Sequence, residues 1–268
     1  MERKKGQSRA LLELRTIDKF FSTAGQEPVQ ACKNISLAVY RGESFGIVGE
    51  SGCGKTTLLR VLLQLIPHTS GEIIFDGQQV DASSPTALRA YWRHIQMVFQ
   101  DSTQAFDPRM RVGPIICEPL YNTGQLPKGK TYEIAEKYLQ MVGLEPSLAR
   151  RYPHEMSGGQ RQRVAIARAL AGEPDIIVFD EATSALDVSV QDAIARMLAN
   201  LQKEKGLTYI FVAHDIAFVQ RMCHRIAVMH RGEVVELIKA DELETSTNPY
   251  TKTLLRSIYT LPDYAKTD

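Results

Sequence analysis

A glycine-rich segment constrains the fold of this chain more than any other feature. Its sequence, Gly49-Glu50-Ser51-Gly52-Cys53-Gly54-Lys55-Thr56, fits the phosphate-binding pattern G-x-x-x-x-G-K-[ST]. The apolar run 44–48 before it predicts a buried strand, and residues 57–66 after it predict a helix that ends before Pro67. A strand, a glycine loop and a helix in this order aim backbone N–H groups and the positive end of a helix dipole at a bound anion. The segment therefore predicts a phosphate-binding loop rather than a structural glycine turn.

The residues that close this loop have expected tasks. Lys55 is expected to reach the β- and γ-phosphates of a nucleotide, and Thr56 to bind Mg²⁺. Thr57 follows on the predicted helix and belongs to the candidate nucleotide-binding set with the loop residues. The thiol of Cys53 inside the loop leaves two interpretations open, a site of alkylation sensitivity or a position where the residue type varies.

Two adjacent acids, Asp180 and Glu181, end the apolar run 176–179. A buried parallel strand delivers such carboxylates to the carboxyl edge of its sheet, where ligands bind in α/β folds. Asp180 is expected to hold Mg²⁺ through its water shell. Glu181 is expected to act as the general base that orients and polarises the water attacking the γ-phosphorus. Strand termination alone would also account for the two acids, but less well in a chain that carries a phosphate loop.

With three further motifs, these residues resemble the ATP-binding subunit of ABC transporters, from about Leu11 to Ser257. Gln100 stands where the family has its Q-loop glutamine, and the resemblance implies contacts from its amide to Mg²⁺ and the attacking water. Ser184-Ala185-Leu186-Asp187 resembles the D-loop, which makes Asp187 a candidate nucleotide-site residue. His214 ends the apolar strand 209–213 and resembles the switch histidine. A lone histidine is more often an ordinary residue, but here the resemblance implies a hydrogen bond to the γ-phosphate.

The segment Met156-Ser157-Gly158-Gly159-Gln160 resembles the signature motif of the family, with methionine in place of the usual leucine. That exchange keeps the apolar bulk of the side chain. The resemblance implies that Ser157, Gly158 and Gly159, together with Gln160, cap the γ-phosphate held by an opposing ATPase subunit. One chain would then supply two half-sites. Hydrolysis would require a head-to-tail pair that closes on ATP and opens after its loss.

The family normally places an aromatic residue that stacks on adenine after the first strand. Phe21 aligns best with this position and Phe20 is the alternative, while an ordinary core role for either ring stays open. Phenylalanine keeps the stacking face of the usual tyrosine and lacks its hydroxyl.

Composition limits the classes of partner. The chain has 268 residues, 44% of them hydrophobic, so it can bury a sizeable core as one nucleotide-binding domain with a subdomain. A net charge of +1 with interspersed acids and bases predicts no nucleic-acid partner. No apolar stretch reaches the roughly 20 residues of a membrane helix, so a membrane role is expected to come through partners. The four cysteines lack C-x-x-C spacing, which favours reduced thiols over disulfides or zinc.

The predicted fold class is α/β, a phosphate-loop (RecA-like) nucleotide-binding core with an antiparallel β subdomain and an inserted α-helical subdomain. Strands over 11–21 and 34–40 are expected to form the β subdomain, and 72–77 is expected to be a further strand. The core sheet is expected to continue with strands at 176–181 and 208–213.

The helical subdomain is expected at about 101–168. Within it, Ile134, Tyr138 and Met141 or Val142 share one face of a predicted helix. We divide the chain into a nucleotide-binding domain, 1–240, and a short C-terminal tail, 241–268.

Three further segments are similar to patterns in the ATPases of oligopeptide, dipeptide and nickel importers. They are Phe106-Asp107-Pro108-Arg109-Met110, Arg151-Tyr152-Pro153-His154-Glu155 and Asn248-Pro249-Tyr250-Thr251-Lys252 with Leu254-Leu255. Ordinary loop chemistry is the alternative explanation. The similarity implies an ATPase subunit that powers peptide import across the cytoplasmic membrane, with nickel or a nickel chelate as the alternative solute. Because the sequence ends at Asp268 and has no cysteine after Cys223, we expect the shorter of two ATPase subunits, without an iron–sulfur cluster.

The resemblance also implies partners and a location. The expected partners are a second homologous ATPase subunit, two transmembrane permease subunits and, indirectly, a solute-binding protein. A heterodimer of ATPase subunits is preferred over a homodimer, on the cytoplasmic face of the cell (inner) membrane. A short permease helix is expected to enter a groove between the Gln100 region and the helical subdomain.

The alternative from another class is a soluble ABC ATPase of DNA repair or translation. Repair-type chains insert long coiled coils between the phosphate loop and the signature, whereas about a hundred residues separate Thr56 from Ser157 here. Translation-type chains usually carry two cassettes, whereas this sequence has one set of motifs.

Overall fold

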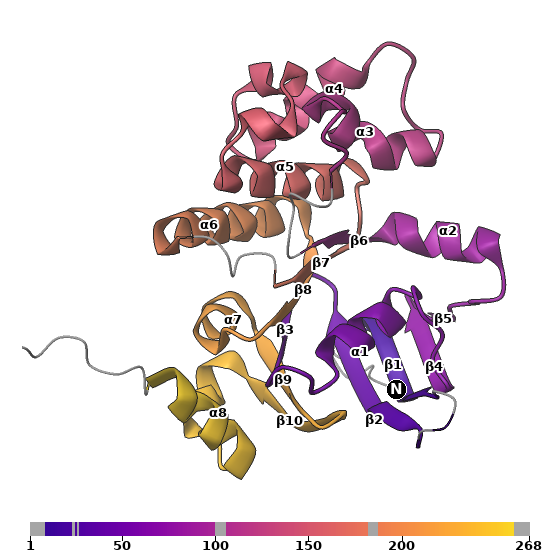
Figure 1. Cartoon of the computed structure of the whole chain (residues 1–268), viewed down its shortest axis with the longest axis vertical. Helices are drawn as coiled ribbons and strands as arrows, with labels where there is room; N and C mark the ends of the chain where they lie inside the picture. Colours follow the sequence, from indigo (N-terminus) through magenta and orange to yellow (C-terminus); the bar gives the residue numbers. More distant parts are fainter. Residues whose placement is uncertain (1–8, 23–24, 26, 100–105, 182–186, 260–268) are drawn as a thin grey trace, which may run out of the picture.

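The computed structural model describes residues 9–22, 25, 27–99, 106–181 and 187–259. The helices within residues 112–171 lie at one end of the molecule, a six-stranded sheet lies in the middle, and a four-stranded sheet lies beyond the helix that starts at Lys55 (Figure 1). Gln100 and residues 184–186 of the predicted D-loop lie outside the described residues.

The strands, in chain order, are β1 (Ala10–Phe21), β2 (Val29–Tyr40), β3 (Ser44–Val48), β4 (Ser70–Phe75), β5 (Gln78–Gln79), β6 (Ile95–Val98), β7 (Ile176–Asp180), β8 (Thr208–Ala213), β9 (Arg225–His230) and β10 (Glu233–Lys239). The α-helices are α1 (Lys55–Leu62), α2 (Pro85–His94), α3 (Val112–Asn122), α4 (Thr131–Met141), α5 (Gly158–Ala171), α6 (Val188–Lys205), α7 (Ile216–Met222) and α8 (Pro249–Tyr259). Three short 3-10 helices are η1 (Pro146–Arg150), η2 (Pro153–Glu155) and η3 (Ala240–Thr245).

The six-stranded sheet has the order β10-β9-β3-β8-β7-β6, and its neighbouring strands are parallel except for the β10–β9 pair. All five residues of β3 are buried, as are all six of β8, because both faces of the sheet are covered. This burial explains why these strands read as continuous apolar runs in the sequence. The carboxyl ends of β3, β7 and β8 lie at one edge, where Val48 pairs with Ala213 and Asp180 with Val212.

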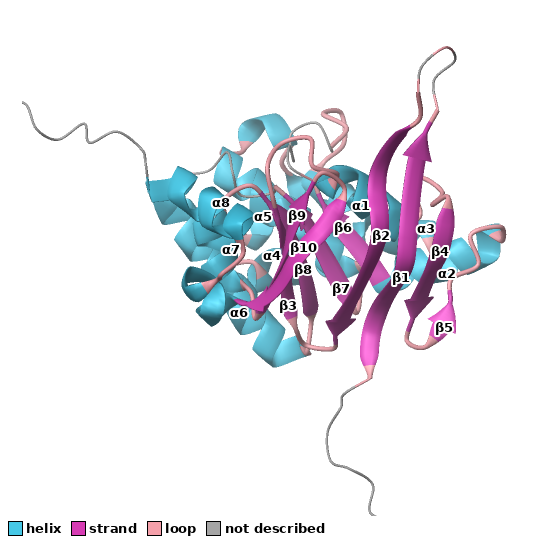
Figure 2. Ribbon diagram, turned by 90° about the horizontal axis from the view of Figure 1, so that it is seen from below, coloured by secondary structure: helices cyan, strands magenta, loops and turns pink. Residues whose placement is uncertain are grey.

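The four-stranded sheet has the order β2-β1-β4-β5 and is antiparallel (Figure 2). Helix α1 lies between the two sheets, and one buried apolar cluster joins its residues Leu58 and Leu59 to Leu12 of β1 and Ile47 of β3. This packing holds the helix that follows the phosphate loop on two sides. It confirms the predicted α/β core with an antiparallel β region.

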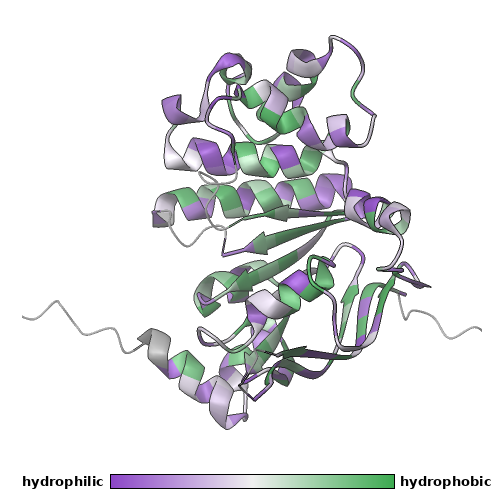
Figure 3. Cartoon of the chain, turned by 45° about the vertical axis from the view of Figure 1, so that its right-hand side comes forward, coloured by the Kyte–Doolittle hydropathy of each residue, from purple (hydrophilic) through white to green (hydrophobic). Residues whose placement is uncertain are grey.

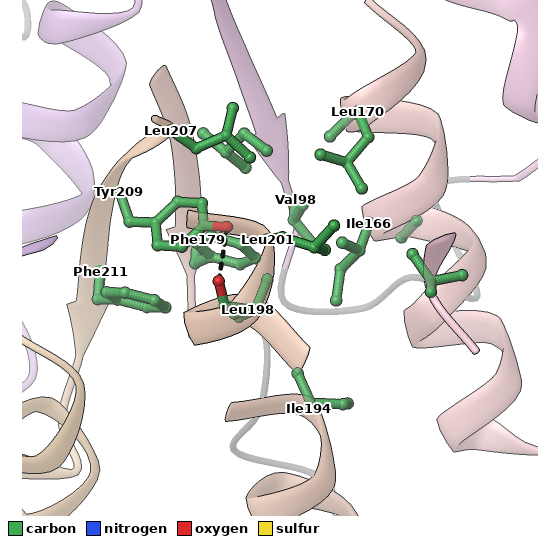
Figure 4. Close-up of a cluster of buried hydrophobic side chains, with 14 of the residues drawn as sticks. Val98, Ile166, Leu170, Phe179, Ile194, Leu198, Leu201, Leu207, Tyr209 and Phe211 are labelled. Atoms are coloured by element: carbon green, nitrogen blue, oxygen red, sulfur yellow. Dashed lines mark hydrogen bonds between the residues drawn. The ribbon is translucent and has the colours of Figure 1, made fainter. Parts of the chain in front are cut away.

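A second buried cluster joins the other face of the core sheet to the helices. Tyr209 of β8 donates its hydroxyl to the carbonyl oxygen of Leu198 in α6, 3.0 Å away, among stacked rings of Phe179 and Phe211 (Figure 4). Apolar residues of α5 and α6 belong to this cluster, and both helices carry hydrophobic and hydrophilic residues along their length (Figure 3). Leu254 and Leu255 of α8 belong to the same cluster, so the predicted tail packs on the core as far as it is described.

Several predicted boundaries were wrong. Helix α1 ends at Leu62 rather than Ile66, because Gln64 takes a positive φ of 54° and its side-chain amide donates to the carbonyl of Val61. Strand β2 begins at Val29 instead of Asn34, and helix α5 runs past residue 168 to Ala171. The predicted helix over 133–142 is confirmed as α4.

Within the described parts of the chain, no helix combines the length and the apolarity that crossing a membrane requires.

Candidate nucleotide site

The segment between β3 and α1 curls tightly over two neighbouring strands. Gly49 has φ 156°, and a Cβ atom there would lie 2.2 Å from the carbonyl oxygen of Met229 in β9. Gly54 has φ 109°, and a Cβ atom there would lie 2.4 Å from the carbonyl oxygen of Ala31 in β2. Both positions therefore need glycine, for their backbone conformation and for the close approach. The predicted glycine loop is confirmed between a strand and a helix.

Helix α1 opens onto a cavity of about 410 Å³. Its N-cap residue is Gly54, which provides no side-chain hydrogen bond to the first turn, so the first N–H groups of the helix keep no side-chain cap. The helix dipole adds partial positive charge at the same place. The cavity is lined by Val29, Gln30, Ala31, Lys33, Ser51, Gly52, Cys53, Gly54, Lys55, Thr56, Thr57, Glu181, Arg231 and Gly232. This arrangement suits the phosphate chain of a nucleotide.

The ammonium group of Lys55 is held inside the loop. Its side chain is 6% exposed, and its Nζ donates to the carbonyl oxygens of Gly49 and Glu50 at 2.7 and 2.9 Å. The Sγ atom of Cys53 lies 3.9 Å from Nζ and is itself buried. A Cβ at Gly49 would lie 2.8 Å from this sulfur, so the thiol fills space beneath the loop. The loop therefore carries a positive charge whose position is fixed before any ligand enters.

Asp180 and Glu181 stand together at the carboxyl end of β7. Burial raises the pKa of Asp180, and the neighbouring Glu181 raises it further, whereas Arg60 and Lys55 lower it. Glu181 has φ 46°, a left-handed backbone conformation that is uncommon for a glutamate, and its N–H donates to the carbonyl of Val212 at 2.8 Å. Two carboxylates in one partly buried place suit a cation, because a divalent ion would relieve their mutual repulsion.

His214 lies at the end of β8, beside these acids. Its Nδ1 is 3.6 Å from Oε1 of Glu181, which is beyond normal hydrogen-bonding distance. The His214 side chain is 59% exposed and the Glu181 side chain 24%. The structure therefore places the predicted switch histidine next to the predicted base, which itself lines the cavity.

The signature residues lie elsewhere, at the N-terminus of α5. Ser157 is the N-cap, where its hydroxyl accepts from the N–H of Gln160 at 3.3 Å, and the side chain of Gln160 accepts from the N–H of Ser157 at 3.0 Å. This capping box sets the start of the helix. A Cβ at Gly158 would meet nothing within 4 Å, and one at Gly159 would lie 3.0 Å from Val190 of α6. None of these signature residues lines the cavity at the phosphate loop.

The remaining predicted residues lie at the margins. Asp187 is exposed and is the N-cap of α6, where its carbonyl accepts from the N–H of Val190 at 2.9 Å. Phe21 ends β1 opposite Val29, which lines the cavity, but neither Phe21 nor Phe20 is a lining residue. The two rings are 43% and 39% exposed, which rules out a core role for either.

The sequence prediction missed one part of the cavity wall, the turn between β9 and β10. Arg231 has φ 47° there and lines the cavity together with Gly232. The N–H of Gly232 donates to the carbonyl of Cys53 at 2.8 Å, and its carbonyl accepts from the N–H of Lys33 at 2.7 Å. An Arg-Gly pair between two apolar runs indicates a hairpin turn, but nothing local places that turn beside a loop far away in the sequence.

A second hollow lies between α2, α3 and α5. Its volume is about 580 Å³. It is lined by Thr86, Arg89, Ala90, Trp92, Arg93, Gln96, Glu118, Pro119, Asn122, Thr123, Arg168 and Gly172. A smaller hollow shares Trp92, Gln96 and Arg168 with it and adds Leu65, Met97 and Phe99. We call the two together the α2–α3–α5 groove. Its lining reaches Phe99, the residue before Gln100 in the sequence.

Comparison with known proteins agrees with this geometry. Residues 32–184 match the model of the family described as ABC transporter. The oligopeptide transport ATP-binding protein OppF of Bacillus subtilis is 46% identical over 257 residues, which cover 94% of this chain and 83% of OppF. A probable peptide ABC transporter ATP-binding protein of Sinorhizobium fredii is 46% identical over 239 residues, 89% of this chain and 67% of that protein.

A solved structure with the same fold is the dimeric, post-hydrolysis state of the ATP-binding cassette MJ0796, bound to ADP and Pi. It superposes with a TM-score of 0.75 at 32% identity, over 85% of this chain and 98% of that one. The phosphate loop, the acids at the end of β7 and the signature at α5 stand in one chain that matches these proteins over most of its length. The chain therefore belongs to the ABC transporter family, as one of its ATP-hydrolysing subunits.

Proposed function

We propose that this subunit powers the import of peptides across the cytoplasmic membrane, as a peripheral protein on its cytoplasmic side. The observation that carries the proposal is the 46% identity to OppF of B. subtilis, an oligopeptide transport protein, over 94% of this chain. A second relative at the same identity is also described as a peptide transporter subunit. The nucleotide site itself is indifferent to the solute, so the substrate class rests on this similarity.

The proposed mechanism begins with ATP in the cavity at the phosphate loop. The N–H groups at the start of α1 and the ammonium of Lys55 bind the β- and γ-phosphates. Glu181 orients the attacking water and accepts its proton, and His214 hydrogen-bonds the γ-phosphate beside it. Phe21, which pairs with the cavity-lining Val29, stacks on adenine. The backbone of Glu181 is fixed by the hydrogen bond from its N–H to the carbonyl of Val212, which supports a role for Glu181 in positioning the water.

The donor set of the site fits Mg²⁺. Among the described residues, no group of three or more His, Cys, Asp or Glu side chains could hold a metal by itself. Mg²⁺ characteristically takes one or two protein oxygens and completes its shell with phosphate oxygens and water. We assign the protein oxygens to Thr56 and Asp180, with Gln100 as a further contact. The ion would supply charge neutralisation at the phosphates.

The signature and Asp187 serve the partner's nucleotide in this proposal. Ser157 and Gly158 are exposed and Gly159 and Gln160 half-buried, at a helix N-terminus that does not line their own chain's cavity and is suited to an anion. The dimeric state of the cassette MJ0796 supports a pair of ATPase subunits. We propose a heterodimer with a second homologous ATPase subunit.

Ser157→Arg is expected to abolish ATP-dependent closure of the ATPase pair, while the single chain keeps its ATP affinity within about twofold. The added guanidinium would occupy the space of the partner's γ-phosphate, and the lost cap would cost about 1 kcal/mol of stability. Light scattering of the purified ATPase pair in the presence of ATP measures closure. Glu181→Gln is present both with and without Ser157→Arg, so that ATP is not cleaved during the measurement.

Ser84→Arg is the matched control for this substitution. Ser84 caps α2 in the same way, with its hydroxyl accepting from the N–H of Ala87 at 3.2 Å. It should reproduce the stability loss and leave closure intact. Closure that survives in Ser157→Arg would remove the signature from the dimer interface.

We propose that two permeases complete the transporter. The α2–α3–α5 groove of this chain receives a short cytoplasmic helix from the permease that contacts it. The groove combines the exposed Trp92 and Phe99 with the basic Arg89 and Arg93, which suits an amphipathic helix with an acidic end. Movement of α5 with the signature would then reach the membrane, since α5 lines the same groove.

Ala90→Arg is expected to prevent co-purification with the permeases while leaving ATP affinity unchanged. Ala90 is exposed in the groove, and a long side chain on α2 would fill it without breaking the helix. The exposed Ala82→Arg, outside both hollows, is the control. Equal permease recovery from both variants would place the permease elsewhere.

Uptake by cells tests the substrate. Cells of the native organism that carry Glu181→Gln in this chain are expected to lose uptake of a labelled tripeptide. Loss of radioactive nickel uptake with normal peptide uptake would replace peptide by nickel as the substrate. Normal uptake of both would overturn the importer proposal.

A further inference from the structure

The C-terminal segment 246–255 touches the phosphate loop directly. The N–H of Glu50 donates to the hydroxyl oxygen of Tyr250, 3.3 Å away, across two hundred residues of sequence. Glu50 stands at the start of the loop, between Gly49 and Ser51. Tyr250 itself does not line the nucleotide cavity. Its hydroxyl therefore contacts the loop from outside the cavity.

The contact falls on the peptide unit whose carbonyl also binds Lys55. The carbonyl of Gly49 and the N–H of Glu50 belong to one planar peptide group. The carbonyl accepts from Nζ of Lys55 at 2.7 Å, and the N–H donates to Tyr250. Because the group is rigid, fixing its N–H end also fixes the direction of its carbonyl end. The tyrosine hydroxyl and the lysine ammonium thus act on opposite ends of the same dipole.

Tyr250 is held in place by contacts on both sides. Its ring packs on that of His230, at the end of β9, with centroids 3.9 Å apart. Asn248 accepts from the N–H groups of Tyr250 and Thr251 at 2.9 and 3.3 Å and donates to the carbonyl of Val235 in β10 at 3.1 Å. These bonds start α8 at a fixed point on the β9–β10 hairpin.

The half-buried carboxylate of Glu236 secures the same segment. The side chain of Glu236 in β10 accepts from the hydroxyl of Ser246 at 2.9 and 2.8 Å, and also from the hydroxyl of Thr251. Ser246 and Thr251 are 4% and 1% exposed, and Leu254 and Leu255 are buried in the core beyond them. The hairpin that carries this segment also bonds to the loop through the N–H of Gly232 and the carbonyl of Cys53. The segment is therefore rigid enough to set the position of a hydroxyl.

We propose that Tyr250 is a positioning residue of the ATP site, whose hydroxyl orients the Gly49–Glu50 peptide so that Lys55 is held ready for the phosphates. This inference rests on the proposal that the loop 49–56 binds the phosphates of ATP. It assigns a task to the segment 248–252, which otherwise only packs on the hairpin. Loss of the hydroxyl should act on nucleotide affinity, because the lysine position is set before ATP enters, and only weakly on the chemical step.

Tyr250→Phe tests the proposal, since it removes the hydroxyl and keeps the ring on His230. The expected result is a rise of about two- to tenfold in the ATP dissociation constant of the full chain, the range for one neutral hydrogen bond. KM of the assembled transporter should rise by the same factor, with kcat changed by less than twofold.

Tyr209→Phe is the matched control. It also removes one hydroxyl bond to a carbonyl, that of Leu198, but Tyr209 pairs with Ser44, at the end of β3 away from the loop. A structural role alone would lower the melting temperature in both variants and leave ATP affinity unchanged in both, and that outcome would overturn the proposal.

Lys55→Ala distinguishes a failure of this inference from a failure of the proposal that the loop 49–56 binds ATP. If Lys55→Ala loses ATP affinity while Tyr250→Phe binds ATP as wild type does, the loop assignment stands and the role of Tyr250 fails. If Lys55→Ala binds ATP normally, the loop assignment itself fails.

Discussion

Glu181→Gln is expected to lower ATP turnover by about 10²–10⁴-fold while the chain still binds ATP. The amide has nearly the shape of the carboxylate but cannot accept a proton from water at neutral pH. Glu181 also raises the pKa of its neighbour Asp180, so the substitution relieves repulsion between the two acids without emptying the site. ATP that binds but is not cleaved should hold the ATPase pair closed. Phosphate release and light scattering of the purified pair measure the two effects.

Glu145→Gln makes the same chemical change at an exposed position that does not line the nucleotide cavity. It should leave turnover unchanged. Wild-type hydrolysis in Glu181→Gln would show that another group activates the water. His214, whose Nδ1 lies 3.6 Å from the Glu181 carboxylate, would be the first residue to examine in that case.

Lys55→Ala is expected to weaken ATP binding by roughly ten- to a hundredfold, because a hydrogen bond to a charged group is worth about 1.5–3 kcal/mol. The ammonium is buried and already oriented by two loop carbonyls, so its loss removes a cation that needs little reorganisation to meet the phosphates. Titration with a fluorescent ATP analogue measures the affinity.

Lys33→Ala tests whether ATP affinity depends on the fixed position of the Lys55 ammonium or only on positive charge in the cavity. Lys33 lines the same cavity, but its side chain is 36% exposed and its Nζ lies 3.4 Å from Glu233. Its removal should cost ATP affinity much less, because solvent screens an exposed charge. Equal losses in the two variants would mean that the cavity binds ATP by net positive charge and that the loop has no special role.

The parts of the site that the sequence predicted are those that depend on local chain geometry. The loop glycines Gly49 and Gly54 are fixed by positive φ and close backbone approach, and such positions leave a recognisable spacing. Ser157 and Gln160 form a capping box within one helical turn, so their place at the start of α5 also followed from neighbouring residues. The acids after β7 followed from a buried apolar run.

The parts that the sequence did not predict depend on contacts between distant segments. The Arg231–Gly232 turn reaches the loop only because β9 pairs with β3, and Tyr250 reaches it only because α8 starts on the β9–β10 hairpin. Strand β6 was not recognised as the edge strand of the core sheet, since its four residues show no period long enough to read. The early end of α1 depends on the positive φ of Gln64, which its residue type does not favour.

The most direct test of the proposed transport function is to purify the tagged chain, carrying Glu181→Gln, from its native membrane in mild detergent with ATP. Mass spectrometry then identifies every protein that stays bound. Two transmembrane permeases and a second ATPase subunit are expected, with a peptide-binding protein among the associated chains. Recovery of ribosomal or DNA-repair proteins in place of permeases would contradict the proposed transport function, and would make this chain a soluble ATPase of the same family.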